Sequence, residues 1–191
     1  MKKYVLTGGP CTGKTTTINQ LSKIGYQTIK EAASILVAEE FNKPGIPLWE
    51  KDAIAFQKKL IFKQLEFESK INTSDNSVFI DRGIIDTIAY CKIYNAVAPK
   101  EFYKIAEKNR YDKIFLLDFL ENYSTSFVRK ESKEKALEIQ NVLLSTYKKF
   151  GYKPIIVPNQ NIIKRVDFIL KEISYMPNLI WQNHTYKLKS R

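Results

Sequence analysis

The sequence predicts an α/β protein built on a parallel sheet, and three observations lead to this fold class. Strand-like and helix-like patterns alternate along the chain, which is the order that parallel sheets with crossover helices require. A glycine-rich turn at 8–13 joins the first strand-like run to the first helical pattern. A later apolar run ends on the charged pair Asp81-Arg82, and parallel sheets bind their ligands beyond such strand ends.

Five short apolar runs are expected to form the strands. Each is rich in β-branched or aromatic residues and is bounded by turn residues, such as Gly25 before the second run and Pro158 after the fifth. The runs lie at about 3–6, 26–29, 78–80, 113–117 and 154–157.

The segments between these runs carry apolar residues at helical spacing. The predicted helices lie at about 14–23, 32–40, 49–71, 84–94, 100–108, 133–150 and 161–174. The clearest loop is 43–47, with two prolines and a glycine. We expect one domain over residues 1–174 and a tail, 175–191, that packs on the same domain through apolar residues such as Trp181.

The turn at 8–13 matches the phosphate-loop pattern G-x-x-x-x-G-K-[ST] at Gly8, Gly13, Lys14 and Thr15. The glycines let successive backbone N–H groups point at phosphate oxygens, and the start of the following helix favours the same anion. Lys14 supplies a charge for the β- and γ-phosphates, and the Thr15 hydroxyl is placed to bind Mg²⁺. The residues expected to hold the nucleotide are Gly8, Gly9, Pro10, Cys11, Thr12, Gly13, Lys14, Thr15 and Thr16.

Two acidic residues follow predicted strands and are candidates for the chemistry. Asp81 can hold Mg²⁺ or accept a proton, and Arg82 beside it can neutralise phosphate charge. Glu31 lies where a general base could face the γ-phosphate. The alternative is that Asp81 and Glu31 merely favour the starts of the next helices. The residues alone leave open which of the two is the base.

Arg129 and Lys130 lie in a polar segment after the fourth predicted strand. Basic groups there could form a lid that covers the γ-phosphate, and the alternative is a charged surface turn. Trp49, Phe56 and Gln57 could wall an acceptor pocket, although a helix packing its apolar face into the core explains them equally well. Residues 158–161 follow the fifth strand, where an adenine edge could be read.

The formal net charge of +11 admits two interpretations. One is a surface for nucleic acid or anionic lipid, and the favoured one is a lysine-rich exterior around a phosphate-binding pocket. A disulfide at Cys11 would block the loop, so we expect a reduced, cytoplasmic setting. The first apolar run is too short for a signal peptide, and we expect no membrane span.

The chain resembles the small predicted ATPase/kinase family often labelled an AAA domain. It is similar in turn to ribosylnicotinamide kinase domains and, more distantly, to deoxynucleoside and thymidylate kinases. The residues that carry the resemblance lie at 8–16, 30–33, 79–83, 111–117, 128–132 and 151–152. The resemblance implies a three-layer P-loop NTPase fold with a five-stranded parallel sheet, helices on both faces, ATP and Mg²⁺ in the loop, and an arginine-bearing lid. The resemblance also favours Glu31 as the base. This chain departs from the family in the lid, where it has Arg129-Lys130 in place of two adjacent arginines.

Together these features predict an ATP-dependent phosphotransferase acting on a small hydroxyl or phosphate acceptor, most plausibly a nucleoside, a nucleotide or a related metabolite. Lys14, Arg82 and Arg129 would stabilise the transferred phosphoryl group. The alternatives are a nucleotide-dependent ATPase switch that acts on a macromolecule, and a nucleic-acid-binding protein that uses ATP. No guanine-reading N-K-x-D sequence occurs. The sequence leaves open the acceptor and whether the protein is a monomer or a homodimer.

Overall fold

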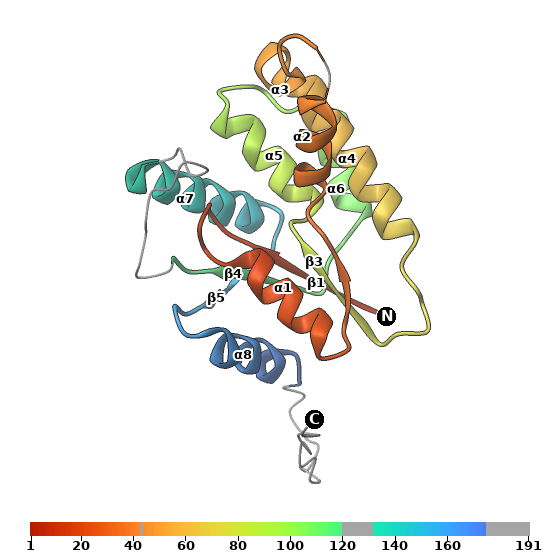
Figure 1. Ribbon diagram of the computed structural model, residues 1–191, viewed down its shortest axis with the longest axis vertical. Coiled ribbons are helices and arrows are strands. Elements are labelled where there is room, and N and C mark those ends of the chain that lie inside the picture. The colour runs from red at the N-terminus through yellow and green to blue at the C-terminus, as the bar shows by residue number, and fades with distance from the viewer. Residues whose placement is uncertain (43, 120–131, 175–191) are drawn as a thin grey trace, which may run out of the picture.

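The computed structural model describes residues 1–42, 44–119 and 132–174. Within them, five strands form one parallel sheet in the order β2-β3-β1-β4-β5 (Figure 1). The strands are β1 Lys2–Thr7, β2 Gln27–Ile29, β3 Ser77–Asp81, β4 Lys113–Leu117 and β5 Ile155–Val157. The predicted parallel α/β sheet is therefore confirmed.

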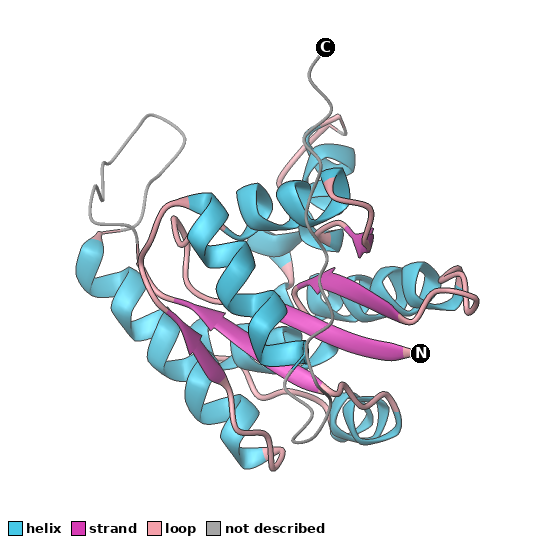
Figure 2. Cartoon of the chain, turned by 90° about the horizontal axis from the view of Figure 1, so that it is seen from below, coloured by secondary structure: helices cyan, strands magenta, loops and turns pink. Residues whose placement is uncertain are grey.

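Helices cover both faces of the sheet (Figure 2). They are α1 Lys14–Lys23, α2 Ala32–Phe41, α3 Leu48–Lys51, α4 Ala53–Ser69, α5 Ile84–Ile93, α6 Lys100–Lys108, α7 Lys133–Lys149 and α8 Ile162–Ser174. Successive residues of β1 point to opposite faces: Val5 packs with residues of α5 and α6, whereas Leu6 packs with residues of α1 and α8. The three-layer arrangement is the one expected.

The register brings the carboxyl ends of the central strands to one edge of the sheet. Leu6 of β1 lies opposite Asp81 of β3, and Thr7 lies opposite Leu116 of β4. These strands are buried on both faces, as parallel strands under two helical layers must be. Loops that leave this edge therefore meet one another above β1 and β3.

The single helix expected over 49–71 is wrong, because the structure breaks it at Asp52. Asp52 has an extended backbone, and its Oδ1 accepts a hydrogen bond from the Ala55 N–H at 2.9 Å. This N-cap begins α4 afresh and leaves α3 as a separate single turn. The rings of Trp49 and Phe56 still pack together across the break, with their centroids 5.8 Å apart. Their positions in the sequence therefore have the spacing of one continuous helix although the backbone is interrupted between them.

A second shift is at α8, which begins at Ile162 because the Asn161 side chain caps it through the Lys164 N–H at 3.0 Å. The expected lid residues Arg129 and Lys130 and the tail 175–191 lie outside the described residues. In the described part of the chain, no helix is long and apolar enough to cross a membrane.

Candidate functional site

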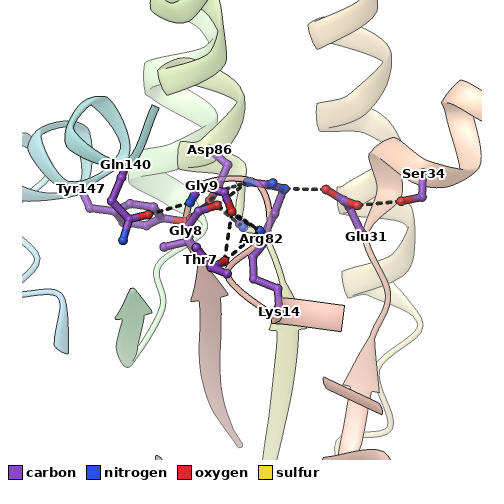
Figure 3. A network of polar contacts seen from close by, with 12 residues as sticks. Thr7, Gly8, Gly9, Lys14, Glu31, Ser34, Arg82, Asp86, Gln140 and Tyr147 are labelled. Carbon is purple, nitrogen blue, oxygen red and sulfur yellow. Dashed lines mark hydrogen bonds and ion pairs between the residues drawn. The ribbon is translucent and has the colours of Figure 1, made fainter. Parts of the chain in front are cut away.

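The phosphate loop runs from the end of β1 to the start of α1 and encloses the side chain of Lys14 (Figure 3). The Lys14 Nζ donates hydrogen bonds to the carbonyl oxygens of Gly8 at 3.0 Å and Gly9 at 2.8 Å. Gly8 and Gly13 have φ values of 145° and 79°, which L side chains rarely adopt. The loop therefore has the conformation and the central cation that the motif predicts for phosphate binding.

Two buried polar residues that the sequence analysis did not single out hold this loop in place. Gln140 of α7 accepts a hydrogen bond from the Gly9 N–H at 2.6 Å and donates one to the Leu117 carbonyl at 3.0 Å. Arg165 of α8, only 2% exposed, donates to the Thr12 carbonyl of the loop. It also reaches the carbonyl oxygens of Asp118 at 3.0 Å and Pro158 at 3.3 Å. The sequence signal that could have identified Gln140 and Arg165 is that each is a polar residue among the apolar positions of its helix.

A second cluster joins the end of β3 to β2 and α5. Arg82 bonds to the Glu31 carboxylate through Nε at 2.5 Å, and to Asp86 at 3.2 Å and the Gly8 carbonyl at 3.3 Å through Nη1. Asp86 also accepts hydrogen bonds from the hydroxyls of Thr7 at 2.6 Å and Tyr147 at 2.5 Å (Figure 3). Sequence reasoning missed Asp86, although it is the one acidic residue of a mostly apolar helix and lies four positions after Arg82.

The structure thus joins Glu31, Arg82 and the phosphate loop, which are far apart in the sequence. Arg82 has a positive φ of 67°, and its N–H donates to the Leu6 carbonyl at 3.0 Å. From this turn after β3 the guanidinium reaches both the Gly8 carbonyl of the loop and Asp86 in the first turn of α5. Backbone strain of this kind is frequent at functional sites.

Burial is the largest influence on the charges of Lys14 and Asp81. It lowers the pKa of Lys14 to about 7, and the neighbouring Arg82 acts in the same direction. It raises the pKa of Asp81 to about 6, and the charge of Glu31 adds to this effect while Arg82 and Lys14 oppose it. Both groups are therefore poised to change charge when a phosphate or a metal ion binds beside them.

Glu31 behaves differently, although burial is again the largest single influence and raises its pKa. The combined effect of Arg82, the Ser34 hydroxyl at 2.6 Å and Lys14 outweighs burial, and the pKa of Glu31 falls below its ordinary value. Glu31 is consequently an ionised carboxylate with a fixed orientation.

The oxygen donors near the loop fit Mg²⁺. Asp81 is buried, and its Oδ1 has no hydrogen-bond partner in the described part of the chain. A carboxylate and the hydroxyl of Thr15 are the oxygen ligands that Mg²⁺ prefers, with the remaining positions supplied by phosphate and water. Among the described residues no group of three or more acidic, histidine or cysteine side chains could hold a metal ion alone. This pattern suits a metal that arrives with a nucleotide.

A cavity of about 390 Å³ opens beside this cluster. The predicted wall residues Trp49, Phe56 and Gln57 all line it, and so do Glu31 and Arg82. The other lining residues come from α2, α4, α5 and the residues that flank α5: Ala32, Ala33, Val37, Leu60, Gln64, Gly83, Asp86, Thr87, Tyr90 and Tyr94. The cavity thus shares the side chains of Glu31, Arg82 and Asp86 with the cluster above the phosphate loop.

A parallel sheet of this order, with a phosphate loop after β1 and an acidic residue at the end of β3, defines a P-loop nucleotide-binding fold. The family model described as AAA domain matches residues 3–165, so the chain belongs to that family. No curated protein sequence matches the chain.

Solved structures share the fold. NadR in complex with NR has a TM-score of 0.73 and 22% identity over 97% of this chain, which covers 54% of NadR. The chain therefore spans about half the length of NadR. Thymidylate kinase from Ehrlichia chaffeensis has a TM-score of 0.64 and 16% identity, covering 90% of this chain and 98% of its own. Deoxyadenosine kinase from M. mycoides has a TM-score of 0.61 and 15% identity over the same two shares, 90% and 98%. The described residues thus have the fold of P-loop kinases.

Proposed function

We propose that the protein is an ATP-dependent phosphotransferase that moves the γ-phosphoryl group of ATP to a small acceptor bound in the cavity. The observation that carries the proposal is the position of Glu31, which lines the cavity and is joined through Arg82 to the Gly8 carbonyl of the phosphate loop. A carboxylate between an acceptor pocket and a phosphate loop is the arrangement that phosphoryl transfer needs. The thymidylate and deoxyadenosine kinases with the same fold support this class of reaction.

The loop residues would bind and orient the nucleotide. The backbone N–H groups within 8–16 and the Lys14 ammonium would hold the β- and γ-phosphates, apart from Pro10, which has no N–H, and Gly9, whose N–H donates to Gln140. Thr15 and Asp81 would hold Mg²⁺. Bound there, Mg²⁺ would neutralise part of the phosphate charge. Arg129 and Lys130 remain the proposed lid, and ATP remains the proposed nucleotide.

Glu31 would accept the proton of the acceptor hydroxyl, and Asp81 would serve the metal. Glu31 lines the cavity, whereas Asp81 is not among the lining residues and lies at the buried end of β3. Arg82 would keep Glu31 ionised and oriented, since it bonds both to this carboxylate and to Asp86. The geometry therefore favours Glu31 over Asp81 as the base.

Labelled ATP tests the proposal directly. The protein is incubated with Mg²⁺, γ-labelled ATP and a panel of nucleosides, nucleotides and cofactor precursors, with Lys14→Ala as the blank. We expect the label to appear on one class of acceptor. Label that goes only to inorganic phosphate, at a rate that no acceptor changes, would replace the proposal with an ATPase.

Glu31→Gln tests the base. It keeps a hydrogen-bonding oxygen for Arg82 but removes the proton acceptor, so kcat should fall by about 100-fold or more while the nucleotide KM changes little. Ser34→Ala is the matched control, because it removes only the 2.6 Å hydrogen bond to Glu31 and leaves the carboxylate. A Glu31→Gln enzyme as active as the Ser34→Ala enzyme would exclude Glu31 as the base.

A further inference from the structure

We infer that Tyr147 of α7 is a positioning residue for the proposed phosphoryl transfer, because its buried hydroxyl fixes the carboxylate that in turn holds the Arg82–Glu31 pair. That carboxylate belongs to Asp86. The inference rests on the proposed function and names a residue on which its site depends. Tyr147 is not among the residues that line the cavity, so it would act through its neighbours and not by touching a substrate.

Asp86 is a buried carboxylate with hydrogen bonds to both of its oxygens. Its side chain is 3% exposed, and four donors from the described part of the chain reach it. Oδ1 accepts from the Thr7 hydroxyl at 2.6 Å and from Arg82 at 3.2 Å. Oδ2 accepts from the Gly83 N–H at 3.1 Å and from the Tyr147 hydroxyl at 2.5 Å. A carboxylate is costly to bury unless its oxygens are paired, so these donors together fix its orientation.

Arg82 needs a fixed partner because it holds Glu31 as well. Its Nε bonds to Glu31 at 2.5 Å, while its Nη1 bonds to Asp86 and to the Gly8 carbonyl. A rotation of the Asp86 carboxylate would pull the guanidinium with it or release it, and either movement would displace Glu31. Of the four donors to Asp86, the Tyr147 hydroxyl alone comes from outside β1 and the turn after β3.

The Tyr147 bond also closes a ring of contacts between this cluster and the phosphate loop (Figure 3). Gln140 lies seven residues before Tyr147 on α7, about two turns along one helical face, and accepts from the Gly9 N–H at 2.6 Å. The preceding loop residue, Gly8, accepts from Arg82. One helix thus holds the loop through Gln140 and the cluster through Tyr147, and loss of the hydroxyl opens the ring.

The Tyr147 hydroxyl suits a constant positioning role. Its ring is fully buried, and burial followed by the charge of Asp86 raises the pKa of Tyr147 well above its ordinary value. The hydroxyl therefore keeps its proton and remains a donor to Asp86 over the neutral pH range.

Tyr111 is a buried tyrosine without this link. Both rings lie against Gly83, since a Cβ there would be 2.8 Å from Tyr111 Cε2 and 3.0 Å from the Tyr147 hydroxyl oxygen. The Tyr111 hydroxyl accepts from the Ile84 N–H and donates to Glu68, both at 2.9 Å. Buried tyrosine hydroxyls usually find a partner, and here neither partner belongs to the carboxylate–guanidinium cluster. Tyr111 therefore offers a matched control.

Tyr147→Phe and Tyr111→Phe are compared in the transfer of label from ATP. Each change removes one buried hydroxyl and keeps the ring, and urea denaturation should show both variants folded. We expect Tyr147→Phe to lower kcat by about tenfold and to change the nucleotide KM by less than about threefold, because the loop still binds. Tyr111→Phe should change kcat by less than about threefold. Equal falls in kcat, or a Tyr147→Phe enzyme as active as the wild type, would overturn the inference.

A double variant tests whether Tyr147 acts through Asp86. Adding Tyr147→Phe to Asp86→Asn should lower kcat by less than about twofold further, because the first change has already removed the charged group that the hydroxyl orients. A further loss of about tenfold would show that Tyr147 acts by another route and would contradict the inference.

The Nε–H resonance of Arg82 reports the pairing with Glu31 without turnover, and its loss in Arg82→Lys assigns it. In the ligand-free protein we expect Tyr147→Phe to shift this resonance and speed its exchange with water, and Tyr111→Phe to leave it in place. A shift in Tyr147→Phe without transfer to any acceptor would support the link from Tyr147 to Arg82 and contradict the phosphotransferase. Transfer with an unchanged resonance would overturn the inference and leave the phosphotransferase standing.

Discussion

Lys14 shows how strongly one residue depends on its surroundings. Its ammonium is buried among the loop carbonyls, and burial together with Arg82 lowers its pKa to about 7. A triphosphate placed beside Lys14 would favour the charged form and raise this pKa. Nucleotide binding should therefore be linked to proton uptake above pH 7.

Calorimetry in buffers of different ionisation enthalpy measures this uptake. At pH 8 Lys14 is mostly neutral in the free protein, so binding of Mg·ATP should take up close to one proton. At pH 6 Lys14 is already charged, whereas Asp81, with a pKa of about 6, would lose its proton to bind Mg²⁺, so net release is expected. Lys14→Arg, charged at both pH values, should abolish the uptake at pH 8. A binding enthalpy independent of the buffer at pH 8 would contradict the prediction.

Gly8 is a second single residue on which the backbone conformation of the phosphate loop depends. A Cβ there would lie 2.9 Å from the Leu117 carbonyl oxygen, and φ is +145°. Gly25 also has a positive φ, +98°, but nothing lies within 4 Å of its Cβ position. Gly8→Ala should therefore lower the free energy of unfolding by about 1–3 kcal/mol more than Gly25→Ala, and weaken nucleotide binding as well. Urea denaturation measures the difference, and equal losses would show that the contact with Leu117 is relieved without cost.

At the scale of elements, the phosphate loop is held by helices that follow it by more than a hundred residues. Gln140 of α7 binds the Gly9 N–H, and Arg165 of α8 binds the Thr12 carbonyl. Arg165 also fixes Pro158 after β5 and Asp118 after β4. One side chain of α8 thereby ties together three loops at the carboxyl edge of the sheet.

Arg165→Met should destabilise the protein by about 3 kcal/mol, because it leaves the Thr12, Asp118 and Pro158 carbonyls without this partner. It should also raise the nucleotide KM more than it lowers kcat, since the residue shapes the loop without lining the cavity. Lys171→Met, in the exposed part of the same helix, should change stability by less than about 0.5 kcal/mol. Urea denaturation and steady-state kinetics test both, and an Arg165→Met protein as stable as the control would show that water replaces the lost bonds.

At the scale of the whole molecule, local signals predicted the sheet and the phosphate loop, because apolar runs, glycines and motif spacing lie close together in the sequence. The interactions that complete the site join distant residues: Arg82 and Glu31 are 51 positions apart, and Arg165 and Thr12 are 153 apart. Periodicity cannot show such pairings. The break at Asp52 was missed for another reason. The helical spacing of apolar residues continues on both sides of Asp52 and predicts one helix, whereas the hydrogen bond from the Ala55 N–H to the Asp52 side chain starts a new one.

The distribution of charge also belongs to this scale. The chain carries a formal net charge of +11, yet lysines of several elements pair with acidic side chains in the described part. These pairs join Lys2 of β1 to Asp112 before β4, Lys58 of α4 to Glu101 of α6, and Lys171 to Asp167 within α8. Lysines spread in this way favour a solvated exterior over a nucleic-acid groove.

Polynucleotide binding should therefore be weak and strongly dependent on salt. Fluorescence anisotropy with labelled single-stranded DNA should give a Kd no tighter than about 10⁻⁶ M near physiological salt. The affinity should fall steeply as the salt concentration rises from about 50 to 200 mM. The polynucleotide should leave the rate of ATP turnover unchanged, because counterion release alone does not engage the phosphate loop. Tight binding that persists at the higher salt, together with faster ATP turnover, would favour a nucleic-acid-dependent ATPase over a small-molecule kinase.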